Sequence, residues 1–150
     1  MTGREPWLGV DLGAARVGLA LSDPDRRLAM PLATLDRAGR GAKALARALA
    51  AEARAQGAGR VVVGLPLNMD GTESPGAAEA RDVAAALEAR GVAASLQDER
   101  RSSVEAHASL REAGRKTKAH KAVVDQAAAV VILQAALDRA RAAAPNITKR

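Results

Sequence analysis

Along the first forty residues, the apolar positions follow the period of two that is typical of β-strands. Residues 16–22 alternate large apolar with small side chains, which predicts a strand with one buried face. A short strand over 7–13 precedes it, and only about two residues separate the two, so we expect an antiparallel hairpin. A third strand is predicted over 28–35, where Pro31 indicates a sheet edge or a break.

Farther along the chain, helical and strand-like patterns alternate. The solid apolar run over 60–65 is expected of a strand that is covered on both faces. Ser74 and Pro75 are residue types that favour the N-cap and the first position of a helix. The expected elements are a helix over 42–56, a strand over 60–65, a helix from Ser74 to about Arg90, a strand over 93–98, and helices over 102–113 and about 121–144.

The order of these elements predicts a single α/β domain. A chain of 150 residues usually forms one domain with its own core, so we assign 1–150 to it and expect a flexible tail over 145–150. Three antiparallel strands come first, and parallel strands joined by helices follow. The predicted architecture is therefore a mixed five-stranded sheet flanked by helices.

Composition excludes several classes of protein. The chain has no cysteine, so disulfides, thiolate metal sites and cysteine nucleophiles are absent. No apolar run approaches the roughly 20 residues that span a bilayer, and no signal peptide begins the chain, so we expect a cytoplasmic protein without membrane contacts. Aromatic residues make up 1% of the chain, which argues against binding of single strands by base stacking.

The formal net charge is +6, and most of it lies in one segment. Between residues 100 and 121 there are seven Lys or Arg and two Glu residues. Within it, 115–121 contains no acid and no apolar periodicity, so we interpret it as an exposed basic loop. Such a loop is either a solvated surface or a contact for phosphate groups, whose counterion release would give salt-dependent affinity.

Asp11 is the most informative acidic residue. It lies within a predicted strand, on the same face as Gly9 and Gly13. Strands are depleted in aspartate, and an unpaired buried carboxylate is costly. The flanking glycines leave room for a ligand or for backbone to approach closely. The alternative is a carboxylate at a strand end that makes a structural hydrogen bond.

Two other regions carry candidate carboxylates. Asp98 and Glu99 end a later strand, and adjacent strand residues point to opposite faces, so at most one of them can turn toward Asp11 while the strand continues. Asp125 shares its helix face with apolar residues at i+3, i+4 and i+7, which indicates a position toward the core. The alternatives are an ordinary polar strand exit and an aspartate that complements the helix dipole.

Together these carboxylates could converge at the carboxyl end of the sheet. Convergent like charges need cations, and ligands that are all oxygen suit Mg²⁺ or Mn²⁺. Two such ions about 4 Å apart can activate a water and stabilise the leaving oxygen of a phosphodiester. The residues alone thus favour a phosphodiester hydrolase that binds two ions.

Four motifs resemble the YqgF/RuvX family of Holliday-junction-resolvase-like pre-16S rRNA nucleases, in register over about residues 8–139. They are Gly9-Val10-Asp11-Leu12-Gly13 with Arg16-Val17-Gly18, then Val63-Gly64-Leu65-Pro66-Leu67-Asn68-Met69-Asp70-Gly71, then Asp98-Glu99-Arg100, and Lys121 with Val124-Asp125, Ala127-Ala128 and Ile132-Leu133-Gln134. The resemblance implies a ribonuclease H-like fold, a bacterial cytoplasmic location and metal-dependent cleavage of structured nucleic acid. The family's roles are 5′ maturation of 16S rRNA and junction resolution.

The resemblance also assigns site residues. The implied catalytic acids are Asp11, Glu99 and Asp125. Asp98 is a further candidate metal ligand, and which member of the Asp98-Glu99 pair binds the metal stays open. Expected nucleic-acid-binding residues are Arg16, Arg100, Arg101, Arg115, Lys116, Lys118 and Lys121, and Asn68 and Asp70 are expected in a loop near the site. The expected partners are Mg²⁺ or Mn²⁺ and either pre-rRNA or branched DNA; homodimerisation and the polarity of cleavage stay open.

This sequence departs from the family pattern at two places. Arg101-Ser102-Ser103 stands where Leu-Thr-Thr or Leu-Ser-Thr is usual, and Ala128 and Ala129 follow Asp125 where related resolvases carry a fourth acid. The missing fourth acid favours a second hypothesis, in which the protein is a module that binds nucleic acid or ribosomes and its acidic site is vestigial. A third, an ATPase lobe of the sugar-kinase type, would need a second lobe to hold the nucleotide.

Overall fold

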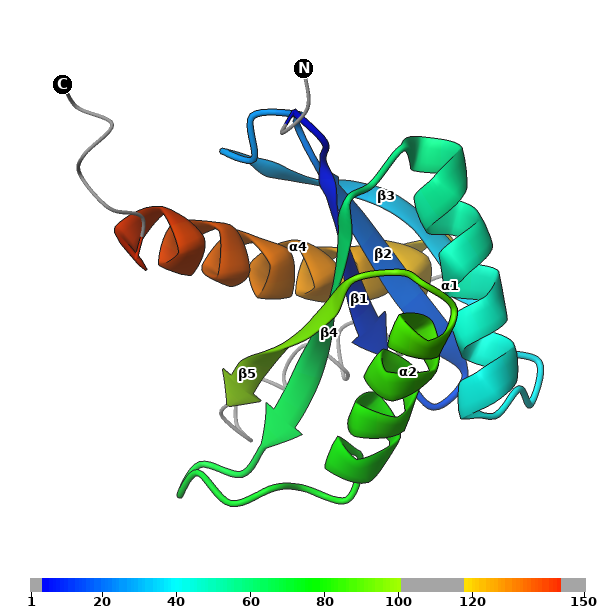
Figure 1. Ribbon diagram of the computed structural model, residues 1–150. Helices are drawn as coiled ribbons and strands as arrows, with labels where there is room; N and C mark the ends of the chain where they lie inside the picture. The colour runs from blue at the N-terminus through cyan, green and yellow to red at the C-terminus, as the bar shows by residue number, and fades with distance from the viewer. Residues whose placement is uncertain (1–3, 101–117, 144–150) are drawn as a thin grey trace, which may run out of the picture.

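The computed structural model of the chain describes residues 4–100 and 118–143 (Figure 1). The elements, in chain order, are β1 (Trp7–Leu12), β2 (Arg16–Ser22), β3 (Ala29–Asp36), α1 (Ala42–Gln56), β4 (Arg60–Leu67), α2 (Ala77–Ala89), β5 (Ala94–Arg100) and α4 (Lys118–Ala143). All five predicted strands are present close to their expected positions, and α1 has the predicted bounds.

The strands form one mixed sheet in the order β3-β2-β1-β4-β5. β1 pairs with β2 and β2 with β3 in antiparallel fashion, whereas β4 is parallel to both β1 and β5. The predicted five-stranded α/β architecture is confirmed. β3 lies at the sheet edge, and its register with β2 shifts beside Pro31, which has no N–H to donate to the ladder.

Helices cover both faces of the sheet. α1 and α2 lie on one face, and α4 crosses the other (Figure 1). β4 serves both layers, because Val61 and Val63 pack in the core that contains Leu49 of α1, whereas Val62 packs in the core that contains Leu133 of α4. Burial of alternate residues on opposite faces explains why this strand has no polar positions in its centre.

Three glycines let α4 lie unusually close to the sheet. A Cβ atom added at Gly9 or Gly64 would lie 2.6 Å from a side-chain carbon of α4, and one at Gly18 would lie 2.1 Å from the main-chain oxygen of Asp125. None of the three has a left-handed φ. Space, rather than backbone conformation, therefore requires glycine at Gly9 and Gly18, whereas at Gly64 the nearest atom is the movable end of the Ile132 side chain.

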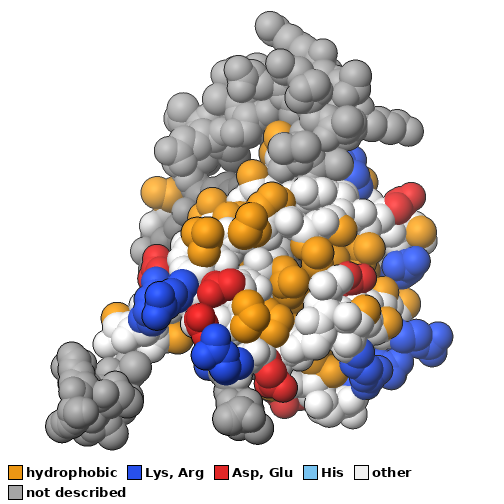
Figure 2. Space-filling view, turned by 90° about the horizontal axis from the view of Figure 1, so that it is seen from above, with side chains coloured by type: hydrophobic (Ala, Val, Ile, Leu, Met, Phe, Trp, Pro, Cys, Tyr) orange, Lys and Arg blue, Asp and Glu red, His pale blue; other side chains and the backbone are white. Residues whose placement is uncertain are grey.

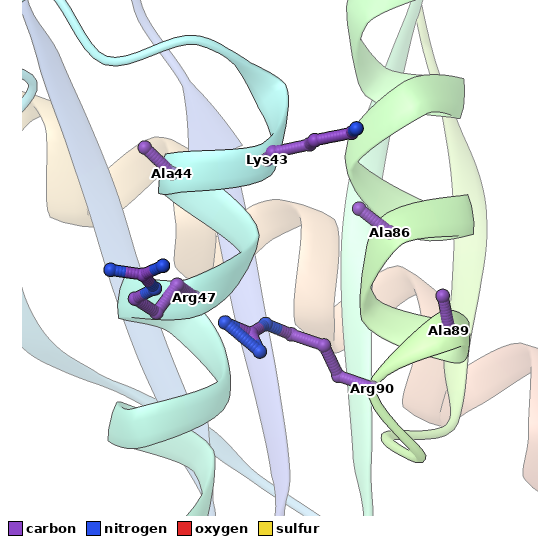
Figure 3. Close-up of a pocket in the computed structure, with 6 residues that line it drawn as sticks. All are labelled: Lys43, Ala44, Arg47, Ala86, Ala89 and Arg90. Carbon is purple, nitrogen blue, oxygen red and sulfur yellow. The ribbon is translucent and has the colours of Figure 1, made fainter.

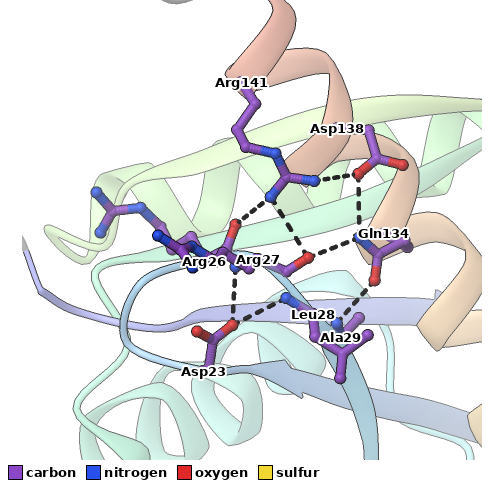
Figure 4. A network of polar contacts seen from close by, with 8 residues as sticks. All are labelled: Asp23, Arg26, Arg27, Leu28, Ala29, Gln134, Asp138 and Arg141. Carbon is purple, nitrogen blue, oxygen red and sulfur yellow. Dashed lines mark hydrogen bonds and ion pairs between the residues drawn. The ribbon is translucent and has the colours of Figure 1, made fainter. Parts of the chain in front are cut away.

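Hydrogen bonds tie the far half of α4 to the loop between β2 and β3 (Figure 4). The Gln134 amide donates to the carbonyl of Arg27 at 2.9 Å and accepts from the N–H of Ala29 at 2.8 Å. The Arg141 guanidinium donates to the carbonyl of Arg27 at 3.4 Å. Within the loop, the Asp23 carboxylate accepts from the N–H of Arg27 at 2.8 Å. These contacts fix the direction in which α4 crosses the sheet.

The predicted start of the second helix was wrong. α2 begins at Ala77, and its N-cap is Gly76, which makes no side-chain capping bond. The Ser74 hydroxyl donates instead to the carbonyl of Pro66 at 2.9 Å, and the Ser74 carbonyl accepts from the N–H of Ala77 at 3.0 Å. A serine that bonds to nearby main chain can stabilise a turn as readily as a helix end, and here it closes a turn.

The interpretation of 115–121 as a loop was wrong in its second half. α4 begins at Lys118, so residues 118–121 form its first turn. Lysine and alanine are good helix formers, and a missing apolar stripe does not prevent helix formation at an exposed end. Residues 115–117, the predicted helix over 102–113 and the predicted tail lie outside the described residues. No helix in the described ranges is long and apolar enough to cross a membrane.

Candidate active site

A small hollow lies at the carboxyl ends of β1 and β4, beside the start of α2. Its volume is about 50 Å³. Its lining comes from four elements and the N-cap of α2: Asp11 and Leu12 (β1), Gly64 and Pro66 (β4), Glu99 (β5), Gly76, Glu79 and Ala80. In sheets with parallel strands, ligands bind outside the carboxyl ends of the strands. The hollow lies at that edge and brings Asp11 and Glu99 together.

The alternation of β5 separates Asp98 from Glu99. Glu99 is half-buried, and its Oε1 lies 3.1 Å from the position that a Cβ would occupy at Gly64, on the face covered by α4. Asp98 is exposed on the other face. There it adds to an increase in the pKa of Arg81 that comes chiefly from the hydrogen bond to Glu73. Glu99, rather than Asp98, therefore shares the hollow with Asp11.

Asp125 approaches the same region from α4. Its main chain lies against Gly18, and Gly18 is directly opposite Asp11 in the β1–β2 ladder. The Asp125 carboxylate, however, accepts a 2.6 Å hydrogen bond from Nε of Arg16 and does not line the hollow. Among the residues that the structure describes, no three His, Asp or Glu side chains are grouped closely enough to hold a metal ion.

Sequence reasoning missed two residues at the rim of the hollow, Glu79 and Arg37. Glu79 lies in the first turn of α2 and forms an ion pair with Arg37, whose side chain is only 14% exposed. Arg37 also donates to the carbonyl of Gly13, in the turn after β1, at 3.0 Å. This pair joins the two sides of the hollow. An acid in the first turn of a helix after β4 was a usable signal for Glu79, whereas nothing in the sequence distinguished Arg37.

The predicted loop residues Asn68 and Asp70 stabilise their own turn. The Asn68 amide donates to the hydroxyl of Thr72 at 2.9 Å, and the Asp70 carboxylate accepts from the N–H of Thr72 at 3.0 Å. Gly71 takes a φ of 91°, which favours glycine. The loop follows the carboxyl end of β4, near the site as expected, but neither predicted residue lines the hollow.

The predicted nucleic-acid-binding residues are only partly described. Arg16 begins β2, and its side chain is 37% exposed and paired with Asp125. Arg100 ends β5, and Lys118 and Lys121 belong to the first turn of α4. Arg101, Arg115 and Lys116 lie outside the described residues. The structure thus places one of the seven side chains, and that one is beside the candidate acids.

The donors of the hollow fit a hard divalent cation. Mg²⁺ in proteins is often held by one or two carboxylates, while water and substrate phosphate complete its coordination. Asp11 and Glu99 offer two carboxylates from separate strands, in a hollow with an opening to solvent. Asp125 is close enough in the fold to be a further candidate, but its carboxylate is held by Arg16.

Comparison with known proteins places the chain in a family. Curated relatives named "Putative pre-16S rRNA nuclease" include one from Kineococcus radiotolerans, 51% identical over 89% of this chain and 72% of that protein. Another, from Bifidobacterium longum subsp. infantis, is 47% identical over 90% of this chain and 98% of that protein. One from Mycobacterium tuberculosis is 47% identical over 94% and 83% of the two chains. The model of the RuvX family, described as Holliday junction resolvase, matches residues 5–139, and the chain therefore belongs to the RuvX family, as its motifs predicted.

Proposed function

We propose that this protein is a divalent-metal-dependent nuclease that hydrolyses phosphodiester bonds of structured nucleic acid, with a 16S rRNA precursor as its substrate. The observation that carries the proposal is the meeting of Asp11 and Glu99 in one hollow at the carboxyl edge of the sheet. Relatives named "Putative pre-16S rRNA nuclease" support this substrate, and the description of the RuvX family model, Holliday junction resolvase, supports structured nucleic acid as the substrate class.

In this proposal, Asp11 and Glu99 hold the cation from two different strands. A bound divalent ion would lower the pKa of a water and stabilise charge that develops on the phosphate. Because β1 and β5 flank β4 in one sheet, the two carboxylates keep their separation without relying on a flexible loop. The Arg37–Glu79 pair fixes the rim and leaves Glu79 neutralised.

In this proposal, Arg16 both orients the Asp125 carboxylate and binds the substrate phosphate. Its Nε holds the Asp125 carboxylate, and its Nη groups make no hydrogen bond to the residues that the structure describes. A guanidinium with open N–H groups is well suited to a phosphate oxygen. We therefore assign Arg16 to the orientation of the substrate backbone. Because Arg16 engages only Oδ2 of Asp125, Oδ1 would remain as a ligand for a second ion.

The test is cleavage of a 16S precursor and of a four-way junction with Mg²⁺ and with Mn²⁺. We expect Asp11→Asn and Glu99→Gln each to reduce cleavage at least about 100-fold, while binding measured in EDTA stays close to that of the wild type. Asp98→Asn is a matched control, because Asp98 is the next residue but lies on the opposite face. Full activity of Asp11→Asn, free of contaminating nuclease, would refute the proposal.

A second candidate function is binding without cleavage. The observation that favours it is the absence, among the described residues, of a group of three acidic or histidine ligands, together with the engagement of Asp125 by Arg16. If purified protein binds precursor rRNA or junctions but cleaves neither with any divalent metal, the site is vestigial. The same assays separate RNA from DNA as the preferred substrate.

A further inference from the structure

A groove runs between α1 and α2, on the face of the sheet opposite α4 (Figure 3). Its volume is about 490 Å³. The residues that line it are Lys43, Ala44 and Arg47 of α1, Ala86 and Ala89 of α2, and Arg90, the C-cap of α2. Three long basic side chains thus border a floor of alanine methyl groups. Figure 3 shows Lys43 and Arg90 reaching into the space between the helices, whereas Arg47 points to the side of α1 that faces away from α2.

The basic side chains of this groove are not neutralised by neighbours. Lys43, Arg47 and Arg90 are exposed, and none forms an ion pair or hydrogen bond through its side chain with residues that the structure describes. One acid, Asp82, lies nearby and lines an adjoining hollow with Lys43. The described lining of the groove itself contains three cations and no acid, which makes the groove positive. Other arginines, such as Arg37, are instead paired with acidic residues.

Figure 2 shows another face of the molecule, where Lys and Arg side chains form separate clusters with acidic side chains between them. At the α1–α2 groove, Lys43 of α1 and Arg90 at the end of α2 reach into the same channel from two helices, and Arg47 adds a third cation on α1. Convergent, unpaired cations along a channel favour an extended polyanion over a single small anion.

The alanine floor decides between kinds of polyanion. Proteins that bind single strands stack bases on aromatic side chains, and the described lining of this groove has none. An acidic helix of a partner protein would need larger apolar side chains in the groove to anchor it. Lys and Arg without such anchors suit the phosphates of a duplex, which they contact without reading its sequence.

We propose that the groove between α1 and α2 is a second nucleic-acid-binding surface, which contacts the phosphate backbone of a duplex segment of the substrate. The inference rests on the proposed function, in which the substrate is structured nucleic acid. α2 connects the two places: Glu79 borders the hollow, and Ala86 to Arg90 border the groove. At 1.5 Å per residue they are about 10–16 Å apart along the helix. About three to five phosphates of one strand cover that distance.

The test is binding of a random-sequence 30-base-pair RNA duplex in EDTA, followed by fluorescence anisotropy over a series of KCl concentrations. For the triple variant Lys43→Gln, Arg47→Gln, Arg90→Gln, we expect the slope of log K against log salt to fall in magnitude by about 2–3, because each lost phosphate contact removes about 0.7–0.9. Each single variant should remove about one, which keeps the test valid if the triple variant folds poorly.

The matched control is the triple variant Arg4→Gln, Arg27→Gln, Arg139→Gln, whose residues lie outside α1 and α2. It removes the same charge from exposed arginines outside the groove, and we expect its slope to change by less than about half as much. Equal slopes for the two triple variants would overturn the proposal. An unchanged duplex affinity combined with lost binding of a poly-glutamate peptide would also overturn it, and would assign the groove to an acidic protein.

Failure of this proposal is distinguishable from failure of the proposed function. If the groove variants lose duplex binding while the wild type cleaves nothing, the binding role of the groove is supported and the nuclease assignment is refuted. If the groove variants bind duplex normally while Asp11→Asn abolishes cleavage, the nuclease assignment is supported and the binding role of the groove is refuted. A short substrate confined to the hollow should be cleaved by the groove variants at the wild-type rate.

Discussion

Replacement of Gly18 by alanine tests the placement of the third candidate acid. Gly18 lies on β2 opposite Asp11, and the main chain of Asp125 covers it. A Cβ at this position would lie 2.1 Å from the carbonyl oxygen and 3.2 Å from the Cβ of Asp125. Because the closest atom belongs to the main chain, no change of rotamer relieves the clash. α4 must move away from the sheet, or β2 must bend.

The size of the effect follows from that distance. To reach the 3.4 Å at which ordinary contacts begin, the carbonyl must retreat from 2.1 Å by about 1.3 Å. Overpacking of this kind costs about 1–3 kcal/mol, and a helix that lifts also loses dispersion contacts around Ala129 and Leu133. Alanine gains about 0.4–1 kcal/mol by restricting the unfolded chain. We expect a net loss of about 2 kcal/mol and a Tm lower by about 4–8 °C.

The measurement is urea denaturation followed by far-UV circular dichroism, with thermal melts in parallel. Gly41→Ala is the control, because a Cβ there meets nothing within 4 Å and the φ of −87° suits alanine; its unfolding free energy should change by less than about 1 kcal/mol. A combined Gly18→Ala, Asp125→Ala variant should not recover stability, because the carbonyl remains. If Gly18→Ala is as stable as the wild type, α4 is not seated where the contacts place it.

Two further predictions concern charges. Arg37→Met and Glu79→Gln should be non-additive in a double-mutant cycle measured by urea denaturation, with a coupling of about 1 kcal/mol for this half-buried pair. Additivity would show that the pair does not stabilise the rim of the hollow. Hydrogen bonds from the N–H groups of Leu28 and Arg27 lower the pKa of Asp23. The charged carboxylate therefore stabilises the fold at pH values above the ordinary pKa of 3.8, and this stabilisation is lost as the pH falls through the lowered pKa. The difference in unfolding free energy between wild type and Asp23→Asn should therefore shrink from pH 7 to pH 3, and a constant difference would contradict the assignment.

The sheet was predictable because local patterns determine it. The period of two over β2, the short connection to β1 and the apolar run of β4 each have one reasonable structural interpretation, and the structure agrees with all three. Pro31 also predicted its own surroundings, since a residue without an N–H is tolerated mainly at an edge or irregularity. Such features depend on a few neighbouring residues, so no knowledge of the tertiary structure was needed.

Features that depend on tertiary contacts were not predictable in the same way. Alternation along β5 showed that Asp98 and Glu99 face opposite sides, but only the pairing of β5 with β4 determines which of them reaches Gly64. The start of α2 depends on a bond from Ser74 to a carbonyl eight residues earlier, which competes with a capping role. For β5 the pattern left two alternatives and strand pairing selected one, whereas for α2 the pattern predicted a cap that a contact eight residues away replaced.

The glycines that flank Asp11 connect the fold to the site in a way that the sequence left open. Room beside the candidate acid Asp11 could serve a ligand or main chain, and here the neighbours are protein. α4 fills the space at Gly9, and a Cβ at Gly13 would lie 2.4 Å from the carbonyl oxygen of Arg16. The same close packing determines the position of α4 and hence of the Asp125 backbone. Arg16 engages Oδ2 of the Asp125 carboxylate, and Oδ1 makes no hydrogen bond to the residues that the structure describes. The close packing of α4 therefore determines where the Asp125 main chain lies, and the bond from Arg16 determines how its carboxylate is oriented beside the candidate acids.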